Sequence, residues 1–443
     1  MKEKKTQSIP KQLFALAFVL IVLVAGSYAW LTLTIDKTNT NVLRAGTLSL
    51  VLDDTTSEGI KLEKAVPISD EKGKTGTEYT FTLQNEGTKP ADYTIYLDDL
   101  ELTSSEKRME DSKVKYQLIK NGNEKISLLS NLRDKVLDSG SIGKDTTNTY
   151  SLRVWIDGEV GNEVMGTVIS KQLRVSAEQV RTTAMCRRAK ILHREICTNT
   201  DANYFCQADG YSIGSEIEYG SLGTKGVLTS GDTFDCDVNG DGVYDPDTER
   251  FYYVSDVTNG ITTDNNTAAL IYYNNVSGGV PNNTKAYAYD STNENWHGPQ
   301  TAVAQLPTTS QWKTTLTKTQ RQITNNNSTT TTTGGDLPVF SYEGYAARFL
   351  TLQEVRLGCG SNLPTWKAGE LSTKCKYLME NTKYSNASNG SYGEWLENPR
   401  ADSSDNAWIV FGDYRYVNFH NAPYTGALGV RPAIEVAKTN IDY

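Results

Sequence analysis

Glu-Tyr-Thr-Phe-Thr-Leu at residues 78–83 and Asp-Tyr-Thr-Ile-Tyr-Leu at residues 92–97 decide the fold of the first part of this 443-residue chain. Polar and apolar residues alternate in both, as they do in β-strands that bury one face. Turn signals separate them from similar runs at residues 47–52, 114–119, 149–156 and 168–175. Short, evenly spaced strands of this kind favour an antiparallel β-sandwich or jelly roll over residues 30–180. A helix is expected only near residues 127–137.

A basic and apolar leader precedes this domain. Lys2, Lys4, Lys5 and Lys11 stand before an apolar run at residues 13–24, which Ala-Gly-Ser-Tyr-Ala follows. The pattern predicts a hydrophobic N-terminal helix over residues 1–29. This helix is a signal peptide cleaved after Ala29 or an uncleaved signal anchor, since about 20 residues span a bilayer. The lysines should stay cytoplasmic, so the remainder is expected to be extracellular, at the cell surface or membrane-anchored.

Composition excludes several classes of function. The net charge is −9, whereas nucleic-acid binders carry an excess of basic residues, so no nucleic-acid partner is expected. The chain has three histidines and no His-Glu-x-x-His pair, no phosphate-cradling glycine loop and no Gly-x-Ser-x-Gly elbow. We therefore expect that the protein is not an enzyme.

All six cysteines lie in residues 181–443 and none in residues 1–180, so the two parts of the chain differ in cysteine content. An exported protein with an even number of cysteines is expected to form disulfides, and fifteen pairings are open. Cys359 with Cys375 is the pair we favour. The basic segment 186–197 is expected to be helical. A metal site made by Cys186, His193 and Cys197 is the weaker alternative, because their spacing matches no common zinc motif.

The first part of the chain resembles a known family. Gly-Ser-Tyr-Ala-Trp at residues 26–30, Val-Leu-Arg-Ala-Gly-Thr-Leu-Ser-Leu at 42–50 and Gln-Asn-Glu-Gly at 84–87 are similar to the TasA/camelysin-like surface proteins of Gram-positive bacteria. The resemblance implies a jelly-roll domain, a surface or matrix location and fibre assembly by strand donation between subunits. Camelysin is described as a metalloprotease, but this sequence lacks a matching His/Glu set, so that activity is not carried over.

The second part resembles another group of proteins. Its closing block, Trp395-Leu396-x-x-Pro399 followed by Gly-Val-Arg-Pro at residues 429–432, is similar to C-type-lectin-fold domains, including formylglycine-generating-enzyme-like modules, in surface proteins of Gram-positive bacteria. The resemblance implies an α+β C-type-lectin-like domain over residues 181–443 with a binding role. A formylglycine-type oxidase would need a reactive cysteine pair in the closing block, and no cysteine follows Cys375. The fold class expected for the whole chain is mainly β.

One loop has the residue pattern of a calcium site. Side-chain oxygens stand at positions 1, 3, 5 and 9 of an EF-hand-type loop, and position 7 supplies a backbone carbonyl. Gly242 stands at position 6, where the loop turns sharply. These candidate Ca²⁺ ligands are Asp237, Asn239, Asp241, Val243 and Asp245. Thr248 occupies position 12 and Glu249 comes one residue late, and a strand rather than a helix is expected to follow. A plain Asp/Gly turn is therefore the alternative.

An aromatic segment near the C-terminus is the candidate ligand-binding surface. Tyrosine offers a large contact area with one polar tip, and loops held at both ends by a core are common recognition sites. The candidates in the expected loop 413–424 are Tyr414, Tyr416, Phe419, His420 and Tyr424. Trp395 and Trp408 are expected to be core residues instead.

Upstream, residues 340–355 predict a strand entering a helix with Thr351 as N-cap and Glu354 completing a capping box.

These features together predict an exported cell-surface protein that presents a lectin-like module for adhesion or recognition. The expected partners are a carbohydrate or protein ligand, the membrane if the leader stays uncleaved, and copies of the same chain in an oligomer or fibre. A structural fibre or matrix subunit and an extracellular hydrolase or oxidase are the alternatives.

Protease applied to intact cells should remove everything after about Thr32, because the basic flank and apolar run orient the chain outward. Immunoblotting with antibodies to both halves would follow the loss. A chain that resists protease until the cells are lysed would contradict this topology.

Overall fold

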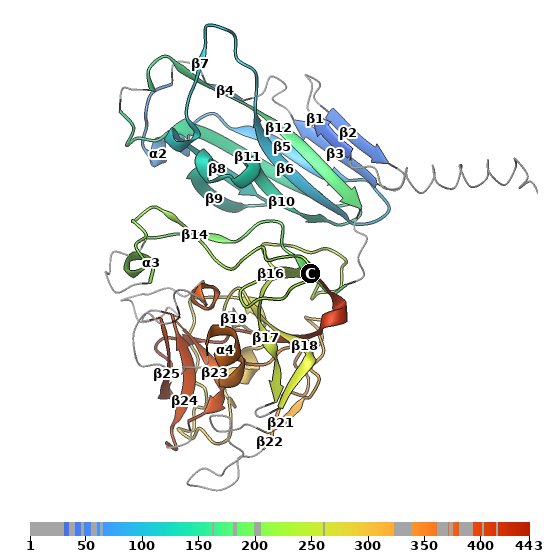
Figure 1. The fold of residues 1–443 in the computed structure, drawn as a ribbon, viewed down its shortest axis with the longest axis vertical. Helices are drawn as coiled ribbons and strands as arrows, with labels where there is room; N and C mark the ends of the chain where they lie inside the picture. The colour runs from blue at the N-terminus through green and yellow to red at the C-terminus, as the bar shows by residue number, and fades with distance from the viewer. Residues whose placement is uncertain are drawn as a thin grey trace, which may run out of the picture. The chain divides into compact units, whose positions relative to one another are not determined.

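The computed structural model describes residues 31–34, 40–45, 48–54, 60–62, 65–161, 164–179, 184–198, 205–259, 262–322, 339–360, 371, 375–380, 393–400, 403–412 and 415–443. The predicted leader, residues 1–29, lies outside them. The described part is mainly β, as the sequence predicts (Figure 1). It divides into two compact units, Met1–Arg181 (unit 1) and Thr182–Tyr443 (unit 2). No helix within the described ranges is long and apolar enough to cross a membrane.

The described residues of unit 1 form two six-stranded sheets, and the chain passes between them several times. One sheet has the order β1 (Leu31–Thr34), β12 (Thr167–Gln179), β6 (Ala91–Asp99) and β10 (Val136–Ile142), with β4 (Ile60–Leu62) and β7 (Lys107–Arg108) also paired to β12. The other has the order β2 (Thr40–Ala45), β3 (Leu48–Asp54), β5 (Tyr79–Asn85), β11 (Thr147–Ile156), β8 (Val114–Lys120) and β9 (Asn123–Leu128). Short helical turns are α2 (Asp70–Gly73), η1 (Asp111–Lys113), η2 (Leu129–Asn131) and η3 (Arg133–Lys135).

All six strand-like runs of the sequence form strands, but the expected helix at residues 127–137 is wrong. The segment contains only the single turns η2 and η3 between β9 and β10. Asp134 and Lys135 have φ angles of 52° and 62°, in the left-handed region that a right-handed helix excludes. The chain therefore turns sharply there and enters β10.

The two sheets of unit 1 share one core, which contains Leu83 and Leu152 of one sheet and Ile95 and Leu173 of the other. A buried polar network also joins them. Tyr93 and Tyr150 donate their hydroxyls to Asp138 Oδ2 at 3.0 and 2.7 Å, and Lys120 Nζ lies 3.6 Å from the same oxygen. Because buried polar groups must find partners, this network fixes β10 against the opposite sheet.

Unit 2 has one six-stranded and one four-stranded sheet. The first has the order β27 (Ala433–Ala437), β18 (Thr262–Tyr272), β17 (Arg250–Asn259), β16 (Thr233–Cys236), β13 (Cys186–Arg188) and β28 (Ile441–Asp442). The second has the order β25 (Tyr416–Asn421), β24 (Asn406–Phe411), β23 (Gly393–Pro399) and β26 (Leu428–Gly429). Three small pairs complete it: β14 (Arg194–Ile196) with β15 (Glu216–Glu218), β19 (Val276–Ser277) with β20 (Val280–Pro281), and β21 (Gln320–Gln322) with β22 (Val339–Ser341).

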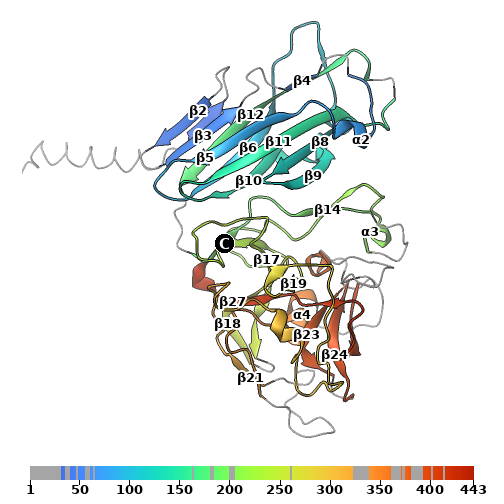
Figure 2. The ribbon, with the colours of Figure 1, turned by 180° about the vertical axis from the view of Figure 1, so that it is seen from behind.

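The helices in the described part of unit 2 are short: α3 (Phe205–Ala208), α4 (Leu352–Cys359), η5 (Ala302–Gln305), η6 (Lys376–Met379) and η7 (Lys438–Asn440). The predicted capping box is confirmed, since the Thr351 side chain accepts a hydrogen bond from the Glu354 NH and the Glu354 carboxylate accepts one from the Thr351 NH. Helix α4 contacts β17 and β23, so it lies between the two sheets (Figures 1 and 2).

The helix expected at residues 186–197 is wrong. Cys186–Arg188 forms β13 and Arg194–Ile196 forms β14. Cys186 lies directly opposite Cys236 in the β13–β16 register and is bonded to it. That pairing holds the segment extended.

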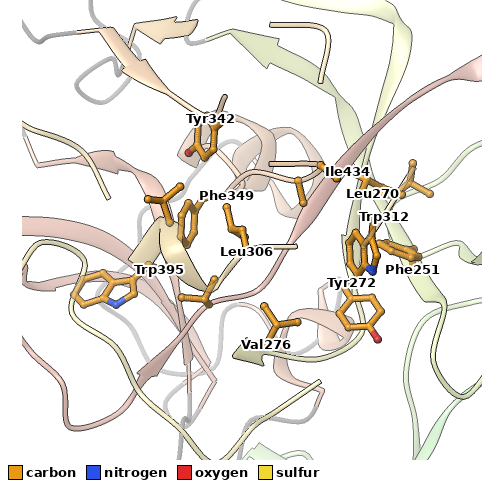
Figure 3. Close-up of a cluster of buried hydrophobic side chains, with 14 of the residues drawn as sticks. Phe251, Leu270, Tyr272, Val276, Leu306, Trp312, Tyr342, Phe349, Trp395 and Ile434 are labelled. Carbon is orange, nitrogen blue, oxygen red and sulfur yellow. The ribbon is translucent and has the colours of Figure 1, made fainter. Parts of the chain in front are cut away.

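An aromatic and aliphatic core fills unit 2. Phe251, Tyr272 and Trp312 contact one another with ring centroids 5.1–5.6 Å apart (Figure 3). Trp395 and Trp408 are 1% and 3% exposed, which confirms the prediction that both are core residues.

A cluster of fully buried charges crosses this core. Arg348 donates to both carboxylate oxygens of Glu354 in α4 at 2.5 and 2.9 Å, and to Glu435 Oε1 in β27 at 2.6 Å. Arg321 in β21 donates to Glu397 Oε2 in β23 at 2.8 Å, and its NH1 lies 3.4 Å from Glu435 Oε1. Burial opposes ionisation of Glu435, but Arg348 and Arg321 keep its pKa below the usual value. The cluster thus ties α4 and three separate strands together.

Replacing Arg348 by Gln should cost about 3–5 kcal/mol of unfolding free energy, because Glu354 would remain buried without its cation and Glu435 would keep only the longer contact with Arg321. Denaturant titration would measure the loss. Arg356→Gln is the matched control, since this half-buried arginine of α4 is not among the ion pairs of the cluster. Equal losses in the two variants would contradict a special role of the buried cluster.

Candidate functional site

The aromatic candidate segment lies on an edge strand rather than in a loop. Residues 416–421 form β25 and pair antiparallel with β24, with Trp408 opposite Phe419 and Phe411 opposite Tyr416. The expectation of a loop over residues 413–424 is therefore wrong for this part. The alternation of Tyr416, Val417, Asn418 and Phe419 suits a strand, and β24 supplies the backbone partners. Tyr414 lies outside the described residues.

The strand separates the candidates onto two faces. Because successive side chains of a strand alternate, Tyr416 and His420 lie on one face and Phe419 on the other. Val417 and Phe419 face the core, where the Phe419 ring meets Trp408 edge-on at 6.1 Å and the Arg400 guanidinium at 3.6 Å. Tyr416 stacks on Phe411 at 5.8 Å. Phe419 is thus a packing residue in this geometry.

His420 and Tyr424 are the candidates that the structure brings together. Their rings stack with centroids 3.8 Å apart. Burial lowers the pKa of His420, so its imidazole is neutral near pH 7. Its Nδ1 has no hydrogen-bond partner among the described residues. Tyr416 lies four residues up the strand from His420, about 13 Å away at 3.3 Å per residue, so the two form separate contact points.

A second segment adjoins this pair and was missed by the sequence analysis. The backbone NH groups of Tyr289 and Asp290 donate to the Ala422 carbonyl at 2.8 and 3.2 Å. Ala422 lies between His420 and Tyr424 in the chain, so the loop that begins at Asp290 runs beside their stack. A signal was present in the sequence, because the loop contains a Trp-His pair at residues 296–297 with carboxylates three and seven residues before the histidine.

The candidate calcium loop connects β16 to β17. Asp237 accepts the backbone NH groups of Gly240 and Gly242 on its two carboxylate oxygens, each at 2.9 Å. Asn239 and Asp241 accept the NH groups of Asp241 and Val243 at 2.8 and 2.7 Å. The first three predicted ligands therefore organise a tight loop through their own oxygens.

The later positions differ from the expectation. Asp245 turns its carboxylate to the following turn, where it accepts from the Asp247 NH and the Thr248 hydroxyl at 3.0 and 2.9 Å. Glu249 instead points back to the loop, accepting from the Asn239 and Asp245 NH groups at 3.3 and 3.1 Å, and it is 2% exposed. Burial, with the nearby charges of Asp241 and Asp237, raises the pKa of Glu249 to about 9.

The described residues contain no group of three or more His, Cys, Asp or Glu side chains arranged to hold a metal ion. The alternative metal site at Cys186, His193 and Cys197 finds no support in the geometry, because both cysteines are in disulfides and His193 Nδ1 lies 2.9 Å from Glu380 Oε1.

Three disulfides link the cysteines: Cys186–Cys236, Cys197–Cys206 and Cys359–Cys375. The last is the pair favoured from the sequence. Disulfides persist in oxidising surroundings, so three of them fit an extracellular or surface location.

Comparisons with known proteins add little. The chain matches no protein-family model and no curated protein. Among solved structures, the Salmonella enterica trimeric lipoprotein SadB is similar over 36% of this chain and 74% of its own, at 12% identity and a TM-score of 0.13. Similarity at that level supports no statement on fold or function.

Proposed function

We propose that this protein is exported and presents unit 2 at the cell surface as a binding module for a carbohydrate or protein ligand. Unit 1 is a jelly-roll domain that supports display and assembly into an oligomer or fibre, and unit 2 is an α+β C-type-lectin-like domain. The observation that carries the proposal is the edge strand β25, where the partly exposed side chains of Tyr416, Asn418 and His420 share one face. Three disulfides and the basic, apolar leader support export.

The β25 surface has the properties of a recognition site. Tyr416, Asn418 and His420 share one face, and Tyr424 stacks on His420 at its end. Aromatic rings bury apolar ligand surface, while amide and imidazole groups fix its orientation. Strand β24 and the Trp408–Phe419 contact hold this surface from behind, so little ordering is needed on binding.

Replacing Tyr416, His420 and Tyr424 together by Ala should weaken binding at least about tenfold, because aromatic anchors contribute most of an interface's affinity. The mature chain would be tested on immobilised saccharides and on collagen, fibronectin and mucin. The control is Tyr345→Ala, which replaces a half-buried tyrosine of unit 2 outside the β24–β25 hairpin. Unchanged binding by the triple variant would place the ligand site elsewhere, and loss of its thermal transition would assign the three side chains to folding.

A second function, calcium binding between β16 and β17, is supported by Glu249. Its buried carboxyl lies against a loop that already holds Asp237 and Asp241. Burial and these two charges raise its pKa to about 9, so it is protonated near neutral pH, and a bound cation would favour its ionised form. We infer that Asp237, Asn239, Asp241, the Val243 carbonyl and Glu249 would hold Ca²⁺, which prefers six to eight oxygen ligands. Glu249 would serve in place of a carboxylate at position 12, and Asp245 would support the turn.

Calcium at 10 mM should stabilise the protein by about 1.4–2.7 kcal/mol if its Kd lies in the extracellular range of about 10⁻⁴–10⁻³ M. Thermal unfolding with calcium and with chelator measures the shift. Glu249→Gln should abolish the shift, whereas Asp442→Asn, an exposed acidic residue distant in sequence, should retain it. Identical melting curves for the parent protein in calcium and in chelator would leave only the plain turn.

A further inference from the structure

The loop from Asp290 to His297 is built onto the end of the β24–β25 hairpin. Asn295 is fully buried, and its side-chain amide donates to the carbonyls of Arg400, Ser403 and Asn406 at 3.0, 2.6 and 2.6 Å. Its backbone NH donates to the Ser404 carbonyl at 2.9 Å. One asparagine therefore fixes the loop to the turn that leads into β24, which gives its neighbours defined positions.

Asp290 supplies a buried acceptor that the protein leaves unused. The residue is 1% exposed, and its Oδ1 accepts the NH and hydroxyl of Thr292 at 2.9 and 2.8 Å. Its Oδ2 has no hydrogen-bond donor within the described residues and lies 3.5 Å from His297 Nδ1. An unsatisfied buried carboxylate oxygen is costly, so Asp290 favours a proton on the adjacent His297 Nδ1.

His297 is oriented by two carboxylates. Its Nδ1 lies 3.2 Å from Glu294 Oε2 as well as 3.5 Å from Asp290 Oδ2. An imidazole nitrogen between two carboxylate oxygens holds the proton, so Nε2 presents a lone pair in the neutral ring. The side chain is about one-third exposed, which leaves the ring within reach of a ligand.

Trp296 places an aromatic surface beside these acceptors. Among the large apolar side chains that the described part exposes by more than a third, it is the one aromatic residue, at 39%. Its ring centroid lies 3.5 Å from that of His297. An exposed indole packed on an oriented imidazole offers an apolar contact surface directly next to hydrogen-bond acceptors.

We propose that Trp296, His297, Asp290 and Glu294 form a binding site for a neutral saccharide. The indole contacts the C–H face of a sugar ring, and sugar hydroxyls donate to Glu294 and His297 Nε2, while the buried Asp290 orients the imidazole. Two acidic side chains disfavour anionic sugars. The proposal rests on the proposed binding function of unit 2 and assigns its ligand class and centre.

The test uses the full mature chain and a defined set of probes. Immobilised glucose, galactose, mannose, N-acetylglucosamine and N-acetylgalactosamine are compared with galacturonate, sialic acid and polylysine. We expect binding to at least one neutral sugar, with affinity lowered at least about tenfold by Trp296→Ala and by Glu294→Gln. The controls Val280→Ala and Glu343→Gln, which alter exposed residues elsewhere in unit 2, should change affinity by less than about twofold.

The results separate this site from the broader binding function. If Trp296→Ala and Glu294→Gln retain full sugar affinity while His420→Ala with Tyr424→Ala loses it, the site proposed here is wrong and the binding function stands. A parent protein that binds matrix proteins but no sugar overturns the saccharide assignment alone. Stronger binding to polylysine or to the anionic sugars than to every neutral sugar also overturns it. A parent protein that binds no probe in either assay counts against both proposals.

Discussion

The buried charges of Arg321, Arg348, Glu354, Glu397 and Glu435 are the constraint on which unit 2 depends. Charges taken out of water must be paired with good geometry, and here each guanidinium meets carboxylates from different elements. Arg348 connects the α4 capping box to β27, and Arg321 connects β23 to the same Glu435. The positions of α4, β23 and β27 are therefore interdependent, and a hydrophobic core alone would define them less sharply.

The candidate binding surface follows from that scaffold. Strand β23 is held by Glu397, β24 pairs with β23, and β25 is the exposed edge of the sheet. The Asp290 loop then attaches to this hairpin through Asn295 and the Ala422 carbonyl. Recognition groups concentrate where loops are fixed on a rigid framework, because little conformational entropy is then lost on binding. The candidate calcium loop has a comparable setting, since Glu249 immediately precedes β17 in the six-stranded sheet.

Local patterns revealed part of the candidate site but not its centre. Asp237, Asn239 and Asp241 could be recognised because their spacing is encoded within a few residues, and they do organise one loop. From the sequence, Glu249 stands one residue after the last ligand position of the loop. Whether its side chain points into the loop depends on how β17 leaves the loop, which the sequence does not show. Tyr416, Phe419 and His420 were grouped by sequence proximity, but a strand sends neighbouring side chains to opposite faces. Asp290 and Trp296 were missed because their loop is fixed by contacts of Asn295 and Asp290 with residues more than a hundred positions away.

The sequence by itself determined six strands of unit 1, the α4 capping box and the core position of two tryptophans, because alternation, capping and large apolar side chains act over short distances. Only the tertiary structure decided the rest. Strand β10 contains Asp138, Ser139 and Ser141 and has no apolar alternation, yet it is buried because Tyr93 and Tyr150 satisfy Asp138 from distant strands. Residues 186–188 are extended because Cys186 pairs with Cys236. A polar group can be buried only where it finds a hydrogen-bond partner, and partners that are distant in the sequence come together only when the chain folds.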